Sequence, residues 1–244
     1  MKFENTDVFN FVGALRGMRN PKESWNKSDS GTGCCKETNN KEFLLCRNCR
    51  NPYCDGGHFQ IGENDMKLAQ SLIRAGSEHR KFMRQIFVSV DITAPLYWWK
   101  EFDTYKIGTV SNSTSTMHTL ASMPIIRNCF EMDDFEEVKI DMSINNFWES
   151  YLIPTLEQLR QKYNETKDKR YWKELIRLLP ESWLQKRTVT MDYENLLAIC
   201  SKGQRRFHKL TEWSKSFIDW ARTLPYAQEL IFLDELSEKA VVDR

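Results

Sequence analysis

Metal-ligating side chains gather in one short part of the chain. The candidates are Cys34, Cys35, Cys46, Cys49, Cys54 and His58. The two-residue spacing of Cys46 and Cys49 brings both sulfurs toward one point, and thiolates select zinc or an iron-sulfur cluster over hard cations. Inclusion of His58 favours zinc, whereas four thiolates suit either centre. The alternative is a set of reduced thiols that bind no metal.

A second chemical group follows an aromatic segment. It comprises Thr109, Ser111, Asn112, Ser113, Thr114, Ser115 and Thr116. Short donors and acceptors of this kind bind phosphate or ribose, or they satisfy the backbone of a surface loop. From composition alone the loop is favoured, because Ser, Thr and Asn clusters between periodic segments are usually loops.

A basic cluster is the third candidate. It comprises Lys202, Arg205, Arg206, His208 and Lys209. Such a cluster can belong to a functional site, and it can equally be a solvated basic turn. Both interpretations stay open from the residues alone.

Hydrophobic periodicity predicts the elements that position these groups in the first half of the chain. One helix is predicted from Asp7 to Arg16, capped by Thr6 and ended by Gly17, and another from Asp65 to Ala75, capped by Asn64. Alternating apolar residues in RQIFVSVDI then predict a strand covered on one face.

That strand leads through Pro95 into a helix that runs to about Tyr105, with Thr93 as its N-cap. Further helices are predicted over residues 144–163, 193–201 and 208–223, and a strand over 184–190. Their expected buried side chains include Phe147, Tyr151, Leu156, Leu210, Trp213, Phe217 and Trp220. Together these elements predict a helix-rich α+β fold with a small central sheet.

Composition bounds the functional class. The 244 residues include 35 basic and 34 acidic side chains, so no net positive field favours a nucleic-acid backbone. No apolar run approaches the roughly 20 residues that span a bilayer, and the N-terminal segment lacks the pattern of a signal peptide. We expect a cytoplasmic protein with one domain over residues 1–244 and a cysteine-rich insertion at 31–61.

The order of elements after Gly62 resembles the flavin-dependent thymidylate synthases, the ThyX family. In that family a helix ending in Gly precedes a turn with His and Glu, then a strand, a helix opened by Ala-Pro, and the signature R-H-R-x-x-S-x-N-E-x-S-x-R. This chain has AGSEHRKF, IFVSVDI and TAPLYWWKEF in the same order. The similarity covers residues 62–122 well and the C-terminal third more loosely.

The signature falls on residues 104–116, where the family's residues contact the flavin and dUMP. Thr104, Tyr105 and Lys106 stand at its R-H-R, and Thr109 at its first Ser. Its N-E pair meets Ser111 and Asn112, its second Ser meets Thr114, and its closing Arg meets Thr116. The chain thus departs from the family at two arginines, the His and the Glu. An arginine pairs with phosphate through a planar fork that a threonine cannot imitate.

The family also has a catalytic arginine near an A-Q-x-E-I-like helix, and two registers compete for it. Arg205 or Arg206 follows the helix DYENLLAIC, whereas Arg222 precedes PYAQELI. We favour Arg205 or Arg206 as catalytic.

The resemblance implies that Thr104, Tyr105, Lys106, Thr109 and His208 bind FAD. It implies that Asn112, Thr114, Thr116 and Arg222 bind the nucleotide substrate. Trp98, Trp99 and Tyr105 are candidates to stack on a ring.

The function that this resemblance implies is methylation of a pyrimidine nucleotide such as dUMP with FAD, NADPH and methylenetetrahydrofolate, by a homotetramer. One alternative is a nucleotide-binding or regulatory protein that keeps the fold without the redox chemistry, motivated by the altered signature. The second is an interaction module held together by the cysteine segment and its metal.

Overall fold

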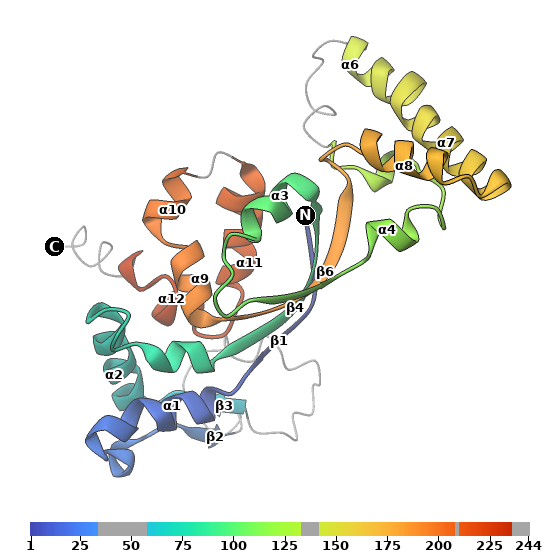
Figure 1. Ribbon diagram of the computed structural model, residues 1–244. Coiled ribbons are helices and arrows are strands. Elements are labelled where there is room, and N and C mark those ends of the chain that lie inside the picture. Colours follow the sequence, from blue (N-terminus) through green and yellow to red (C-terminus); the bar gives the residue numbers. More distant parts are fainter. Residues whose placement is uncertain (34–57, 133–141, 208–209, 236–244) are drawn as a thin grey trace. The chain divides into compact units, whose positions relative to one another are not determined.

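A computed structural model describes residues 1–33, 58–132, 142–207 and 210–235 of the chain. They form a helix-rich α+β fold with a small sheet, which confirms the predicted fold class (Figure 1). The four-stranded sheet has the order β1 (Lys2–Phe9), β4 (Phe87–Pro95), β6 (Leu184–Asp192) and β5 (Val110–Ser113). An antiparallel pair, β2 (Gly31–Gly33) and β3 (His58–Gln60), stands apart from it.

The α-helices are short. They are α1 (Phe11–Arg19), α2 (Glu63–Arg74), α3 (Leu96–Phe102), α4 (Thr116–Thr119), α6 (Met142–Phe147), α7 (Ile153–Thr166), α8 (Lys169–Leu178), α9 (Tyr193–Ile199), α10 (Lys202–Phe207), α11 (Ile218–Arg222) and α12 (Ala227–Leu230). Tighter 3-10 turns are η1 (Asn20–Lys22), η2 (Trp25–Lys27), η4 (Lys81–Gln85) and η5 (Arg127–Cys129). Wider π-helical turns are η6 (Trp148–Leu152) and η7 (Glu212–Phe217).

The chain divides into two compact units. The first unit contains residues 1–5, 90–106 and 110–189, and the second contains residues 6–89, 107–109 and 190–244. This division does not test the expected single domain over 1–244, which stays a prediction. The cysteine-rich insertion at 31–61 lies mostly outside the described residues.

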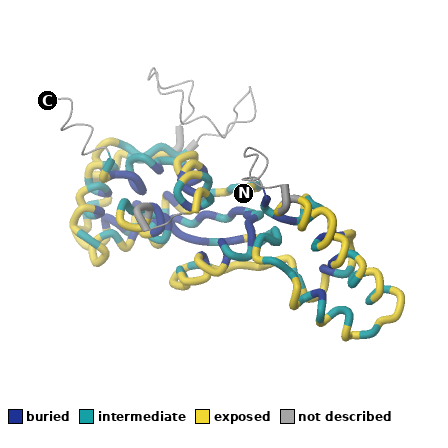
Figure 2. Tube along the Cα trace, turned by 90° about the horizontal axis from the view of Figure 1, so that it is seen from above, coloured by how far each residue is buried: buried dark blue, intermediate teal, exposed yellow. Residues whose placement is uncertain are grey.

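Strand β4 has the burial that its sequence predicts. Val88, Val90 and Ile92 are fully buried, as is Ile86 directly before the strand, and the residues between them are half-buried. Figure 2 shows the buried residues of the described chain in dark blue and the exposed ones in yellow. Because side chains of a strand alternate between its faces, the apolar set fixes which face meets the core.

In the first unit, two apolar clusters form. On α3, Trp98 and Trp99 contact Phe102 with ring centroids 5.1 and 5.5 Å away, and all three side chains are buried. Helices α7 and α8 lie side by side and bury Leu156 and Leu175 (Figure 1). These contacts give the unit its core.

In the second unit, α1 packs beside η4 and α2. Phe11 contacts the rings of Tyr193 and Tyr226 edge-on, at 5.7 and 5.6 Å between centroids. The buried Tyr193 hydroxyl donates to the Pro225 carbonyl oxygen at 2.6 Å, and burial raises the pKa of Tyr193 well above its ordinary value. This unit therefore joins N-terminal and C-terminal segments of the chain in one core.

The predicted start of the first helix is wrong. Residues 6 and 7 belong to β1, and α1 begins at Phe11 after Asn10, whose positive φ of 73° reverses the chain. The helix also passes Gly17, where an added Cβ would lie 2.7 Å from the Gln85 side-chain oxygen. The glycine thus allows close packing and does not end the helix, and pairing with β4 decides that residues 2–9 are a strand.

Two predicted capping residues are also wrong. Gly62 occupies the N-cap position of α2 in place of Asn64, and the Asp29 carboxylate accepts the main-chain N–H groups of Asn64 and Asp65 at 2.8 and 3.1 Å. Thr93 lies inside β4, so that Pro95 precedes α3. After Ala75, the C-cap residue of α2, Gly76 adopts a φ of 105°.

The helical face predicted for residues 144–163 is partly wrong. Phe147 and Tyr151 are 53% and 66% exposed and stack on each other at 6.5 Å. The π turn η6 widens the helix there, so that Trp148 and Leu152 pack against the buried cluster instead. Leu210 is likewise exposed, whereas Trp213, Phe217 and Trp220 are buried as predicted.

The described helices include none that combines the length and the hydropathy needed to cross a bilayer.

Candidate functional site

Residues 110–113 of the hydroxyl-rich segment form the edge strand β5, whereas its composition favoured a loop throughout. All four residues of β5 are exposed. At its end, the Thr114 amide and hydroxyl both donate to the Lys186 carbonyl oxygen of β6, at 2.8 and 3.1 Å. The side chain of Asn112 is exposed and makes no hydrogen bond with another described residue. The strand part of the predicted ligand-binding segment is therefore accessible and fixed to β6.

Gln185 of β6 connects this strand to α4. Its amide nitrogen donates to the Thr114 carbonyl oxygen at 3.0 Å and to the Thr116 hydroxyl at 3.2 Å. Gln185 itself is only 8% exposed, and both hydrogen bonds are partly buried. The main-chain oxygen of Gln185 accepts the Trp99 indole N–H at 3.0 Å. A buried amide thus orients two of the residues predicted to bind the substrate.

Arg187 extends the same network. Its Nε donates to Gln185 Oε1 at 2.9 Å, and its Nη1 donates to Asp103 Oδ1 at 2.8 Å. The guanidinium carbon lies 4.3 Å from the centre of the Trp99 ring, and the side chain is 14% exposed. Sequence reasoning missed Arg187, although its two-residue spacing from Gln185 and Val189 in a predicted strand places it on the buried face.

The positions of the family's R-H-R triplet follow α3. The Thr104 hydroxyl donates to the Glu101 carbonyl oxygen at 2.7 Å and is exposed. Tyr105 is half-buried and Lys106 is exposed, and the Lys106 ammonium group makes no hydrogen bond or ion pair with another described residue. Trp98 and Trp99, by contrast, are 0% and 1% exposed, so the prediction that they stack on a ligand is wrong.

Thr109 belongs to the second unit, where the preceding turn is tied to the start of α9. The Asn195 amide donates to the Ile107 carbonyl oxygen at 2.5 Å, while Asp192 and Asn195 form a reciprocal capping box. Gly108 has a φ of 77°, and a Cβ there would lie 2.7 Å from Asp192 Oδ2. Burial raises the pKa of Asp192 above its ordinary value. The three-residue spacing of Asp192 and Asn195 in the sequence DYEN is the signal for this capping box.

A polar cavity of about 230 Å³ lies in the second unit. Arg74, Arg80, Ser201 and Lys202 are among its lining residues. Arg80 is already paired with Glu194, its Nε lying 2.9 Å from Oε2. Because Lys202 opens α10, the predicted catalytic residues Arg205 and Arg206 stand on the same helix as a lining residue. His208 lies outside the described residues.

Arg222, the competing candidate for the catalytic arginine, stands at the end of α11. Its Nη2 donates to Glu235 Oε1 at 2.9 Å, and its guanidinium carbon lies 4.2 Å from the centre of the Phe232 ring. Both partners line the polar cavity. The structure therefore places Arg222 at the rim of the cavity that α10 also borders.

Five of the six predicted metal ligands lie outside the residues that the structure describes. Cys34, Cys35, Cys46, Cys49 and Cys54 lie outside the described residues, and His58 begins β3. Elsewhere in the described ranges, no three His, Cys, Asp or Glu side chains gather closely enough to hold a metal ion. The metal site therefore stays a prediction.

Comparison with solved structures gives a clear result for the fold. A flavin-dependent thymidylate synthase ThyX from Helicobacter pylori, complexed with FAD and dUMP, matches 96% of this chain and 99% of its own, with a TM-score of 0.61 and 17% identity. A second ThyX structure from the same organism, also with FAD and dUMP, matches with a TM-score of 0.58 and 16% identity. This chain has a ThyX-like fold. No family model and no curated protein matches it.

The ThyX-like fold confirms the family resemblance at the level of structure. It does so along nearly the whole chain, beyond the residues 62–122 that carried the resemblance. The site residues transferred from ThyX are divided between the units: positions 104–106, 112, 114 and 116 lie in the first, and positions 109, 205, 206 and 222 in the second. Their common role in one site stays a prediction.

Proposed function

We propose that this protein is an enzyme similar to ThyX, which methylates a pyrimidine nucleotide such as dUMP with FAD, NADPH and methylenetetrahydrofolate. The observation that carries the proposal is a fold shared over 96% of the chain with ThyX structures that hold FAD and dUMP. FAD, when bound, would carry the hydride. The protein's own groups then have to bind and orient the reactants.

The described donor set fits the oxygen-rich parts of these ligands. The ammonium of Lys106 and the amide of Asn112 are exposed and have no hydrogen-bond partners elsewhere in the described chain. Hydroxyls at Thr104, Thr109, Thr114 and Thr116 add acceptors along the same segment. Such groups bind phosphate, ribityl or ribose oxygens. Arg205, Arg206 and Arg222 are the proposed cations for catalysis and nucleotide binding, together with His208 toward the cofactor.

The proposal also includes assembly and location. We propose a homotetramer, as the resemblance to ThyX implies, in the cytoplasm. Tyr105 would contact FAD through its half-buried ring. Zinc or an iron-sulfur cluster at the cysteine segment remains a separate structural proposal.

Reconstitution with FAD tests the proposal. The purified chain is expected to take up FAD with the flavin absorbance band, and to bind dUMP in the presence of FAD. Lys106→Gln removes the one cation at the signature and should weaken FAD about tenfold, or roughly 1.4 kcal/mol. Lys100→Gln is the matched control, because Lys100 is an exposed lysine of α3 that pairs with Glu181 at 2.6 Å. Absence of FAD uptake by the wild-type chain would contradict the proposal.

The second candidate is a nucleotide-binding protein without redox chemistry. The favouring observation is that hydroxyl side chains replace the guanidinium groups of the signature at Thr104 and Thr116. Calorimetric titration separates the candidates, since dUMP binding without any FAD binding supports only the second.

A further inference from the structure

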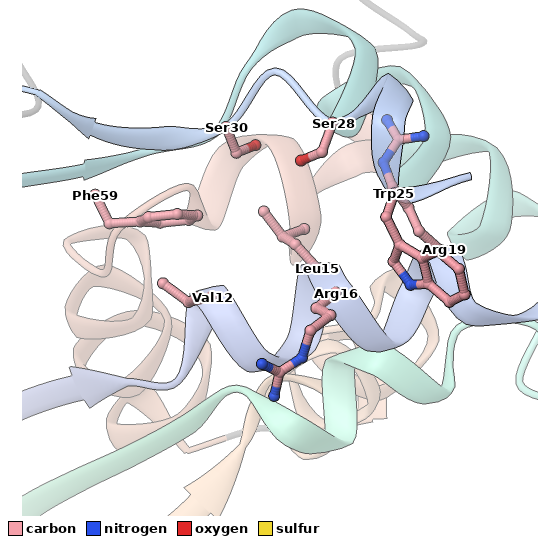
Figure 3. A pocket seen from close by; sticks show the side chains of 8 residues that line it. All are labelled: Val12, Leu15, Arg16, Arg19, Trp25, Ser28, Ser30 and Phe59. Atoms are coloured by element: carbon pink, nitrogen blue, oxygen red, sulfur yellow. The ribbon is translucent and has the colours of Figure 1, made fainter. Parts of the chain in front are cut away.

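A cavity of about 190 Å³ lies beside α1 in the second unit (Figure 3). Its walls come from α1, from η2 and the residues after it, and from β3. None of its described lining residues belongs to the site transferred from ThyX. The cavity is thus a separate feature of this chain.

Two aromatic side chains form part of the wall. The ring of Phe59 stacks on Phe11, with centroids 6.4 Å apart and an interplanar angle of 19°. Trp25 is 50% exposed, yet its indole N–H donates to the Asn20 side-chain oxygen at 2.9 Å, which holds the ring in place. Together with Val12 these rings present an apolar surface that water reaches (Figure 3). An aromatic ring of a ligand can pack against this surface by stacking or edge-on contact and so bury its apolar area.

The volume limits the size of the ligand. Sites for drug-sized molecules have roughly 300 to 1,000 Å³, which exceeds this cavity. A single aromatic ring with one substituent is the size that fits. The side chain of Leu15, on α1, lies near those of Val12 and Phe59 and forms part of the cavity wall (Figure 3).

The available hydrogen-bond donors come from two arginines. Arg16 is exposed and makes no ion pair or hydrogen bond with any described residue. The Arg19 side chain is 5% exposed, with Nε on Asp65 and Nη1 on the Ser24 carbonyl oxygen, while Nη2 has no acceptor in the described part of the chain. Both arginines are among the residues that line the cavity. The site therefore offers donors with positive charge.

The remaining polar groups do not compete for an anion. The hydroxyls of Ser28 and Ser30 both donate to Asp65 Oδ2, at 2.6 and 2.5 Å, and face each other at one edge of the cavity (Figure 3). Asp65 is fully buried and saturated by these donors and Arg19. Its negative charge offsets the Arg19 guanidinium, and the Asp29 carboxylate, which accepts the main-chain N–H groups of Asn64 and Asp65, is not part of the lining. Arg16 is therefore the charged residue of the described lining that has no counter-charge.

We propose that this cavity binds a free aromatic acid of one ring, with the ring against Phe59 and Trp25 and the anionic group on Arg16. The proposal is independent of the ThyX-like function. It names a binding site for a small metabolite or effector of this chemical class.

Titration of the full chain with benzoate and with benzamide, followed by NMR line shifts of the ligand, tests the proposal. The wild-type chain should bind benzoate about tenfold more tightly than benzamide, because only benzoate pairs with a guanidinium. Arg16→Gln should remove this preference and leave benzamide binding within about twofold. Arg16 makes no described contact, so this variant should fold normally.

Two further variants complete the design. Val12→Trp, at a position that is 57% exposed, should fill the cavity and abolish binding of both compounds. Arg74→Gln, an exposed arginine that lines the other cavity, should bind benzoate like the wild type. Equal binding of benzoate and benzamide, or wild-type binding by both Arg16→Gln and Val12→Trp, would overturn the proposal.

Discussion

Each compact unit holds an arginine against an aspartate, and the two pairs differ in burial. In the second unit, Arg19 and Asp65 side chains are 5% and 0% exposed, with Nε and Oδ1 2.5 Å apart. In the first unit, Arg187 is 14% exposed but Asp103 is 52% exposed, at 2.8 Å. Water can still solvate Asp103, whereas it cannot reach Asp65. The buried pair therefore requires a complete set of protein partners.

The pKa of Asp65 illustrates this requirement. Burial raises the pKa of Asp65. Hydrogen bonds from Ser28, Ser30 and Arg19 together lower it by more than burial raises it, so the pKa lies below its ordinary value. The carboxylate is thus charged at neutral pH in spite of its burial. Loss of any single partner removes part of this compensation.

The largest effect is expected for Asp65→Asn. This variant leaves the Arg19 guanidinium buried without its counter-charge, which typically costs about 3 to 5 kcal/mol of folding free energy. Urea unfolding followed by circular dichroism measures the loss. The double variant Asp65→Leu with Arg19→Met removes both charges and should recover much of it. A loss below about 1 kcal/mol for Asp65→Asn would mean that the buried pair behaves like a surface pair.

An intermediate effect is expected for Arg187→Met. The variant keeps contact with Trp99 but loses the hydrogen bonds to Asp103 and Gln185, which should cost about 1.5 to 3 kcal/mol. Thermal unfolding measures the change. Arg187→Lys can restore the charge but not both hydrogen bonds, because the ammonium lacks the planar fork. Full stability of the lysine variant would show that charge alone matters here.

The smallest effect concerns Asp91, in an open network of the first unit. Hydrogen bonds from Thr188, Asn5 and Lys186 lower its pKa to about 2, below the ordinary value of 3.8. The folded state thus holds the proton less tightly than the unfolded state. The resulting stability is fully present above pH 3.8 and is lost as the pH falls toward 2.

Urea unfolding of the wild type and Asp91→Asn at several acidic pH values measures this contribution. The difference between the two proteins should shrink as the pH falls through this window, because the wild-type carboxylate becomes neutral like the amide. A difference that stays constant over the window would contradict the assigned pKa.

Strands β4 and β5 differ in whether their sequence pattern predicts them. The alternation of Ile86, Val88, Val90 and Ile92 predicted β4, because one side of that strand meets a core. Strand β5 is exposed at all four positions, so it has no such alternation. Hydrogen bonding to β6 makes it a strand, and no local pattern encodes that pairing.

The candidate site shows the same limit. The hydroxyl row and the R-H-R positions were found from the sequence, since residue types and order suffice to align them with ThyX. Arg187 and Gln185 were missed, because their role depends on Trp99, Asp103 and Thr116, which are distant in the chain.

The sequence by itself determined the α+β class, the buried face of β4, the helix after Pro95 and the resemblance to ThyX, because these depend on local periodicity and residue order. Only the tertiary structure decided that the N-terminal residues form β1, that the π turn exposes Phe147, and that Asp65 is buried with Arg19. These features arise from contacts between distant segments. A buried ion pair is stable only where folding brings all its partners together.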